Sequence, residues 1–228
     1  MYVPNYIPEP LEVPGNVTLD PYPTRVRFIR TVTYLHLGSL AVVGALASVP
    51  LPQVRIGISL AILSVLLILM DVLRICLRGK PLEAKISGAL LPVVLLVVAF
   101  AVIELQKHFP VWAFAAGPAA CGVYTLVCGR DYSFVGCFFL SWITSSVIIA
   151  ALAAYFQLTP GQAAFGLSVN FAYLSYYVYD LAALLARRRR DEALAAVVDL
   201  YRDVFNIFGY LLRVIGHWKK HRIWVSPR

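Results

Sequence analysis

The sequence predicts an all-α, polytopic membrane protein: a bundle of seven transmembrane helices with a semi-polar seventh helix at its centre. Three observations predict this fold. Of the 228 residues, 60% are hydrophobic and 14% are charged, whereas soluble domains average about 45–50% and about 25%. Apolar runs of about 20 residues, long enough to cross a bilayer, recur along the chain. The connections between them are short and often contain proline or glycine, which leaves no room for a water-soluble domain.

Composition and charge also exclude several other classes of protein. A secreted, disordered or ordinary cytosolic chain of this size does not contain so much apolar surface. The net charge of +8 would indicate nucleic-acid binding in a soluble protein, but here the cations flank apolar runs, where they set topology and contact anionic lipids. The four cysteines form no C-x-x-C pair, so a disulfide framework or a zinc site is not expected. We therefore expect no cofactor and no nucleic-acid partner.

Six windows of high hydropathy predict membrane-spanning helices. They cover residues 31–49, 55–76, 86–105, 111–128, 133–156 and 162–185. A seventh window, 193–216, is long enough to span but contains four charged residues. It either crosses the membrane or re-enters, and its polar face must be covered by protein or water. The predicted organisation is a proline-rich cytosolic tail at 1–30, a membrane domain at 31–216 and a basic tail at 217–228.

The distribution of lysine and arginine predicts the orientation in the membrane. If the N-terminus is cytosolic, that side receives twelve of these cations, whereas the opposite loops contain only Arg55 and Lys107. The twelve are Arg25, Arg27, Arg30, Arg74, Arg78, Lys80, Lys85, Arg130, Arg187, Arg188, Arg189 and Arg190. We therefore expect a multi-pass protein with a cytosolic N-terminus.

Aspartates within the sixth and seventh spans are the candidate functional residues. An aspartate in the middle of a membrane helix costs about 2.5–3.5 kcal/mol on translocon scales, so such residues usually face a bundle interior and serve a purpose. The seventh span has a polar face at steps of four, three, four and three residues: Asp199, Asp203, Asn206, Tyr210 and Arg213. The sixth span has a similar stripe: Asn170, Tyr173, Tyr177 and Asp180. We expect the two stripes to face each other across the turn at 187–190.

Several short motifs along the chain resemble those of a known family, the transmembrane BAX inhibitor motif family. The resemblance rests on Phe28-Ile29-Arg30-x-Val32, Leu77-Arg78-x-x-Pro81, Tyr179-Asp180 and, above all, Leu200-Tyr201-x-Asp203-x-x-Asn206-x-Phe208 followed by Leu211-Leu212-Arg213. The similarity extends over essentially the whole chain, but outside these motifs it consists of hydrophobic spacing. Viral members of the family exist, and a short, arginine-rich chain is compatible with one.

The resemblance implies a function as well as a fold. It implies a seven-helix bundle that acts as a pH-sensitive calcium leak of the endoplasmic reticulum or Golgi and modulates cell death, in contact with the bilayer, Ca²⁺ and other membrane proteins of cell-death pathways. It also implies a pair of aspartates, Asp180 and Asp203, that holds the pore closed and opens according to protonation. From the two facing stripes we expect the pair to share a proton or to pair with Arg78, and to attract Ca²⁺ when ionised. An arginine at the cytosolic end of the second helix would bond to the pair. Arg78 matches that position best and Arg74 second. Asp199 and Asn206, on the same face as Asp203, complete the predicted ion path.

Three residues depart from the family pattern. Leu181 and Ala182 replace the usual threonine and glutamine after Tyr-Asp, which removes polar partners of the aspartate pair. Arg202 stands before Asp203, where the family has an apolar residue. Because consecutive helical residues are about 100° apart, Arg202 lies off the polar stripe. We expect it to snorkel toward a headgroup or to line a neighbouring water-filled face.

Other interpretations of the same residues remain open. The polar stripes could be structural, a hydrogen-bond network that ties two helices together in a membrane adaptor of apoptosis or immune signalling that conducts no ions. An intramembrane aspartyl protease also uses two aspartates, but it needs Gly-x-Gly-Asp and Pro-Ala-Leu motifs. The seventh span has Tyr201-Arg202-Asp203 instead, and Pro-Ala-Leu does not occur in the sequence. We therefore do not expect an enzyme.

Overall fold

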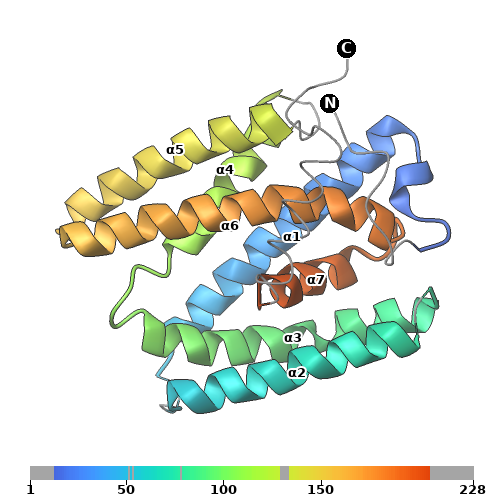
Figure 1. The fold of residues 1–228 in the computed structure, drawn as a ribbon, viewed down its shortest axis with the longest axis horizontal. Coiled ribbons are helices and arrows are strands. Elements are labelled where there is room, and N and C mark those ends of the chain that lie inside the picture. Colours follow the sequence, from blue (N-terminus) through green and yellow to red (C-terminus); the bar gives the residue numbers. More distant parts are fainter. Residues whose placement is uncertain (1–12, 51, 53, 78, 129–133, 206–228) are drawn as a thin grey trace.

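The computed structural model describes residues 13–205 except 51, 53, 78 and 129–133. The described chain contains one 3-10 turn, Val17–Leu19, and seven α-helices. These are α1 (Tyr22–Ser48), α2 (Ile56–Cys76), α3 (Pro81–Leu105), α4 (Ala113–Cys128), α5 (Phe134–Tyr155), α6 (Pro160–Arg187) and α7 (Ala193–Phe205). The helices α2 and α3 pack along one edge of the bundle, α5 and α6 pack along the other, and α1 crosses between them (Figure 1). The prediction of an all-helical fold is confirmed.

Four of the described helices are long and apolar enough to cross a membrane: α1, α2, α3 and α5. A shorter apolar helix covers Ala113–Val127. The described part of α7 ends at Phe205, so the full window 193–216 lies only partly within the described residues. The count of seven crossings and the choice between a crossing and a re-entrant seventh segment therefore stay predictions.

The ends of the helices follow from local sequence. At the start of α6, the Thr159 hydroxyl accepts from the backbone N–H of Gln162, whose side chain accepts from the Thr159 N–H, and Pro160 occupies the first turn. This arrangement is a capping box, which satisfies amides that a helix start leaves unpaired. The helix α1 begins at Tyr22, before the predicted start at residue 31. The first turns are too polar for an apolar window, yet they contain no residue that interrupts a helix.

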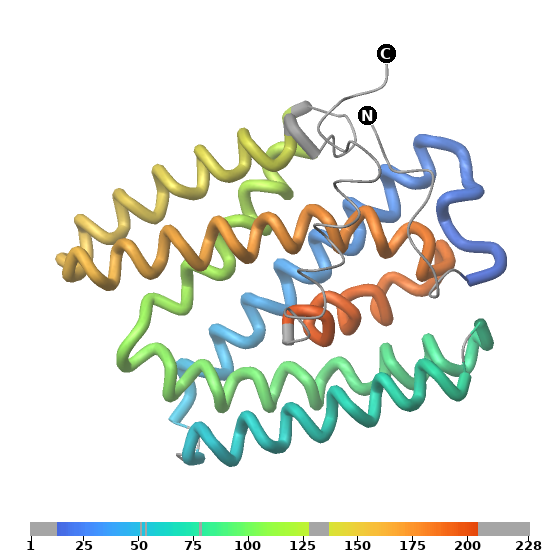
Figure 2. The backbone as a smooth tube through the Cα atoms, in the orientation of Figure 1, coloured from blue at the N-terminus to red at the C-terminus, as the bar shows by residue number. Residues whose placement is uncertain are grey.

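The most deeply buried helix is α7, although it is also the most charged. It lies between α6 and α3 and packs against α1 as well (Figure 2). Every residue from 195 to 203 is buried, and this stretch includes Asp199, Arg202 and Asp203. In α6 the second half is similarly enclosed, and Asp180 is completely inaccessible to solvent. The two helices therefore bring their charged residues into the interior at the same end of the bundle.

Candidate functional site: a buried ion-pair network

The guanidinium of Arg187, the last residue of α6, contacts one aspartate on α6 and one on α7. Arg187 Nη1 lies 2.9 Å from Asp180 Oδ1 and 2.7 Å from Asp203 Oδ2, and all three side chains are buried. The hydroxyl of Tyr176 donates to Asp180 Oδ2 over 3.3 Å. We call the contact of Arg187 with the two aspartates the arginine bridge. It places the two aspartates that the sequence singled out on the same cation.

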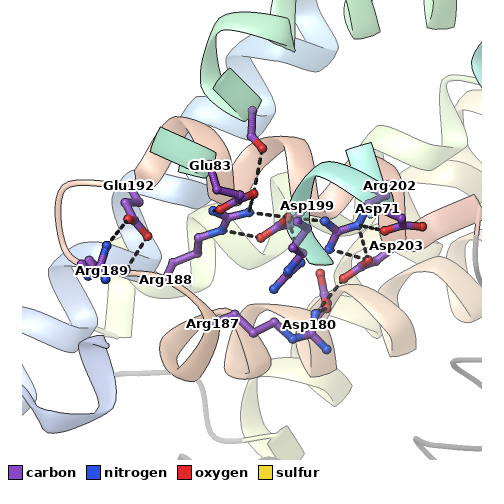
Figure 3. A network of polar contacts seen from close by, with 12 residues as sticks. Asp71, Glu83, Asp180, Arg187, Arg188, Arg189, Glu192, Asp199, Arg202 and Asp203 are labelled. Carbon is purple, nitrogen blue, oxygen red and sulfur yellow. Dashed lines mark hydrogen bonds and ion pairs between the residues drawn. The ribbon is translucent and has the colours of Figure 1, made fainter. Parts of the chain in front are cut away.

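The bridge follows from helical spacing along α6. Tyr176, Asp180 and Arg187 are separated by four and seven residues, which places them one and two turns apart on the same face. The helix ends at Arg187, and Arg188 has an extended backbone with φ −132° and ψ 152°. Neighbouring side chains in extended backbone point in opposite directions. Arg187 and Arg188 therefore reach different partners, as Figure 3 shows.

Arg188 forms the second part of the network. Its Nε and Nη2 donate to the two oxygens of Asp199 over 2.6 and 2.8 Å, a bidentate pair. Its Nη1 and Nη2 also donate to Glu83 at the start of α3, over 2.6 and 3.1 Å. Burial disfavours the charge of Arg188, but Asp199 and Glu83 outweigh that penalty and raise the pKa of Arg188 above its ordinary value. Arg74 of α2 donates to Asp199 over 3.1 Å.

Arg202 links the two parts. It lies 3.0 Å from Asp199 Oδ1 through Nη1 and 2.9 Å from Asp203 Oδ1 through Nη2. Its Nε is also 3.2 Å from Asp71 of α2, whose side chain is 47% exposed. Because Arg202 contacts aspartates from both parts, the arginine bridge and the Arg188 cluster form one continuous network (Figure 3).

The network holds more carboxylates than guanidinium groups. We define the ion-pair network, among the described residues, as five acids and four arginines: Asp71, Glu83, Asp180, Asp199, Asp203, Arg74, Arg187, Arg188 and Arg202. If every group is ionised, its net charge is −1. Burying an ion is costly unless it is paired, and removing one partner of a buried pair typically costs about 3–5 kcal/mol. The arrangement can therefore hold α2, α3, α6 and α7 together only while each carboxylate keeps a cationic partner.

The structure places the predicted site residues as follows. Asp180, Asp199 and Asp203 all lie in the network. Arg78 and Asn206 lie outside the described residues, so nothing is added about their roles. The second candidate for the cation on the aspartate pair, Arg74, contacts Asp199 instead, and the guanidinium between Asp180 and Asp203 belongs to Arg187. Asp180 and Asp203 thus share a guanidinium in this arrangement, and the predicted sharing of a proton stays a prediction.

Of the two expectations for Arg202, snorkelling toward a headgroup is wrong, and the lining of a water-filled face stays a prediction. Only 4% of its side chain is exposed, and it contacts carboxylates on α2 and α7. Sequence spacing placed it off the polar stripe, but the long side chain can reach around the helix to the carboxylates on both sides. The departure from the family pattern therefore adds a cation to the interior, where it balances three acids.

The described residues contain no group of three or more histidine, cysteine or acidic side chains arranged to hold a metal ion. Both candidate calcium ligands, Asp180 and Asp203, contact Arg187 in this arrangement. A cation that bound both carboxylates would have to displace that guanidinium. The two carboxylates are thus charge-paired in this arrangement.

Sequence reasoning missed Arg187, Arg188 and Glu83 as members of the site. From the sequence alone, the run at 187–190 is a topological signal. A usable signal was present, because Arg187 lies seven residues after Asp180, at a spacing that returns to the same helical face. No comparable signal identified Glu83, which is far from Arg188 in sequence and is brought to it only by the packing of α3 against α7.

Comparisons with known proteins show relatives over part of the chain. Protein LIFEGUARD 3 of Arabidopsis thaliana is 34% identical over 90 residues, which cover 38% of this chain and 36% of that protein. A BI1-like protein of the same plant is 32% identical over 88 residues, 38% of this chain and 34% of that protein. The matches thus cover about a third of the length of these curated relatives. No family model matches the chain, and no solved structure matches it significantly.

The relatives and the apolar helices both indicate a membrane protein. Four helices long and apolar enough to span a bilayer support a multi-pass integral membrane protein, which is the kind of protein that the sequence motifs predict. The homologues of this chain are accordingly LIFEGUARD and BI1-like proteins, members of the transmembrane BAX inhibitor motif family, at 27–34% identity over part of the chain.

Proposed function

We propose that this protein is a pH-sensitive, calcium-permeable leak channel of intracellular membranes, in the endoplasmic reticulum or Golgi, that modulates calcium stores and cell death. The observation that carries the proposal is the arginine bridge. It connects α6 and α7 through buried charges, inside a bundle whose outer helices suit a bilayer. Ionisable groups within membrane proteins are costly and commonly mark ion pathways. The proposal includes no catalytic step.

The proposed closed state depends on the ionisation of the two aspartates. Arg187 attracts both carboxylates: protonating Asp203 removes the ion pair between α6 and α7, and protonating Asp180 removes the pair within α6 that helps to hold Arg187 in place. A carboxylate that is ionised in the closed state contributes stability at high pH and loses it as the pH falls. Acidification is therefore expected to favour opening and to raise the calcium flux.

The chemistry of the network also suits a divalent cation. Ca²⁺ prefers carboxylate oxygens in flexible arrangements. Once Arg187 leaves, Asp180 and Asp203 would present acidic oxygens from two helices, and the network already has one more acid than arginine among the described residues. We therefore propose that these two carboxylates attract Ca²⁺ transiently along the path.

Calcium flux into liposomes that contain only the purified protein tests this proposal. The unmodified protein is expected to admit Ca²⁺ faster than empty liposomes, and Arg187→Gln is expected to raise the flux because it removes the cation that joins the aspartates. Arg190→Gln is the matched control, since its side chain is 72% exposed and its contact with Asp20 is long, at 3.9 Å. Properly inserted protein without any flux would contradict a channel and favour an adaptor whose network is structural.

The proposal includes an orientation. We expect residue 1 and the turn at 187–190 on the cytosolic side, because that assignment gives the twelve-to-two bias of cations. Impermeant labels applied to sealed vesicles would test it through single cysteines at the two positions. Opposite accessibility of the two cysteines would exclude the proposed topology.

A further inference from the structure

The residues before α1 form a structured segment, which we call the strap (residues 13–20). Val17 lies within it and is completely buried in the main hydrophobic core. Asn16 is 3% exposed; its amide donates to the Val13 carbonyl over 2.9 Å, and its side-chain oxygen accepts from the Thr18 N–H over 3.0 Å. The strap therefore has an anchored side chain and internal hydrogen bonds, although it lies within the tail predicted at residues 1–30.

The strap binds the backbone on both sides of the bridging arginine. The Val13 N–H donates to the carbonyl of Ala186 over 3.0 Å, and the Val17 N–H donates to the carbonyl of Arg188 over 3.1 Å. These two carbonyls belong to the residues before and after Arg187. In Figure 2 the strap, in dark blue, lies beside the loop that joins α6 to α7. It thus fixes the part of the chain from which the bridging side chain extends.

Arg189 fastens the same turn to the loop between α2 and α3. Its Nε donates to the carbonyl of Pro14 in the strap over 3.2 Å, and its Nη2 donates to the carbonyl of Gly79 over 2.6 Å. Gly79 has φ +74°, and a Cβ atom added there would lie 3.8 Å from Pro14 Cδ. Three segments that are far apart in sequence therefore meet at Arg189.

We propose that the strap holds the turn at 187–190 in its charge-paired arrangement and so keeps the proposed ion path closed. This proposal rests on the proposed function. Arg187 and Arg188 extend from this turn, and the strap is hydrogen-bonded to its backbone, so a movement of the turn that carried both guanidinium groups away from their carboxylates would break the strap's hydrogen bonds. Releasing the strap removes this restraint without changing any charge in the ion-pair network.

Two neighbouring substitutions in the strap test the proposal. Val17→Ser places a hydroxyl in an apolar site that is completely buried and is expected to release the strap. Leu19→Ser, two residues away, is the matched control because Leu19 is 76% exposed. Arg189→Gln tests the same restraint independently, since it removes the contacts with Pro14 and Gly79. Hydrogen–deuterium exchange of the purified protein in detergent measures the opening of the backbone hydrogen bonds in the strap and the turn. Calcium flux in liposomes measures whether the proposed ion path is open.

The expected result is that Val17→Ser and Arg189→Gln speed amide exchange at 186–192 severalfold and raise the flux, whereas Leu19→Ser changes neither. Faster exchange in the strap with unchanged exchange at 186–192 would overturn the restraint. Faster exchange at 186–192 with unchanged flux, in a protein that conducts, would overturn the role in closure. If no variant and no unmodified protein conducts, the proposed channel fails, and the exchange data alone still decide whether the strap restrains the turn.

Discussion

The helices α2 and α7 present opposite surfaces to their surroundings. Helix α2 exposes large apolar side chains along its length, including Ile62, Val65, Ile68 and Ile75. In α7, by contrast, Asp199, Arg202 and Asp203 are all buried. A soluble protein would bury the first set and expose the second. The contrast indicates that the surroundings of α2 are lipid and that the charges of α7 are stabilised by one another and by arginines from neighbouring elements.

The two surfaces also differ in how they respond to substitution. An apolar surface in lipid makes no specific contacts, so many residues fill it equally well. A buried ion pair depends on its partner, because a charge left alone in the interior is strongly unfavourable. The following predictions test this difference, beginning with the largest expected effect.

Arg188→Met is expected to be the most destabilising change, because it leaves Asp199 and Glu83 without their main cation. The loss should be about 3–5 kcal/mol in the free energy of unfolding, as for other buried charges that lose a partner. Thermal unfolding in detergent measures it. Arg190→Met, in the same turn with an exposed side chain, should change the unfolding temperature little. Equal unfolding temperatures for the two variants would mean that the network does not stabilise the bundle.

Two adjacent residues of α2 test the lipid-facing surface. Leu63 is 1% exposed and Ile62 is 50% exposed. Leu63→Ala should cost about 2–5 kcal/mol through a packing cavity, whereas Ile62→Ala should have a much smaller effect because lipid chains fill the space. The same thermal assay compares them. A larger loss for Ile62→Ala would show that this face contacts protein.

Asp71→Asn should have the smallest effect within the network. Its side chain is half exposed and it contacts Arg202, which Asp199 and Asp203 still neutralise. Exposed ion pairs contribute at most about 1 kcal/mol. A loss of unfolding free energy as large as that of Arg188→Met would show that the half-exposed Asp71–Arg202 pair contributes as much as the buried pairs.

Hydropathy and helical periodicity predicted much of this molecule. The apolar windows identified helices close to α2, α3 and α5, and the polar stripe on α6 placed Asp180 on a buried face. These features are local, because they depend on residues a few positions apart. The steps from Asp199 to Asp203 likewise identified one face of α7 before any packing was known.

The partners of these aspartates could not be predicted in the same way. The contact between Arg188 and Glu83 depends on how α3 packs against α7, and the bonds from the strap to the turn depend on where the chain before α1 lies. Neither has a periodic signature. The flexible reach of Arg202 is a further example, since its position on the helical wheel placed it off the polar stripe, whereas its contacts include the carboxylates of that stripe.

The central claim is that Asp180 and Asp203 act as one unit through Arg187, and calcium flux as a function of pH tests it most directly. Asp180→Asn, Asp203→Asn and the double variant should be compared in liposomes with the unmodified protein and with Asp191→Asn, an exposed aspartate outside the network. Each single variant should raise the flux at neutral pH and flatten its increase on acidification, and the double variant should add little, because residues of one network are not additive. A pH response in both single variants that matches the unmodified protein would contradict the claim.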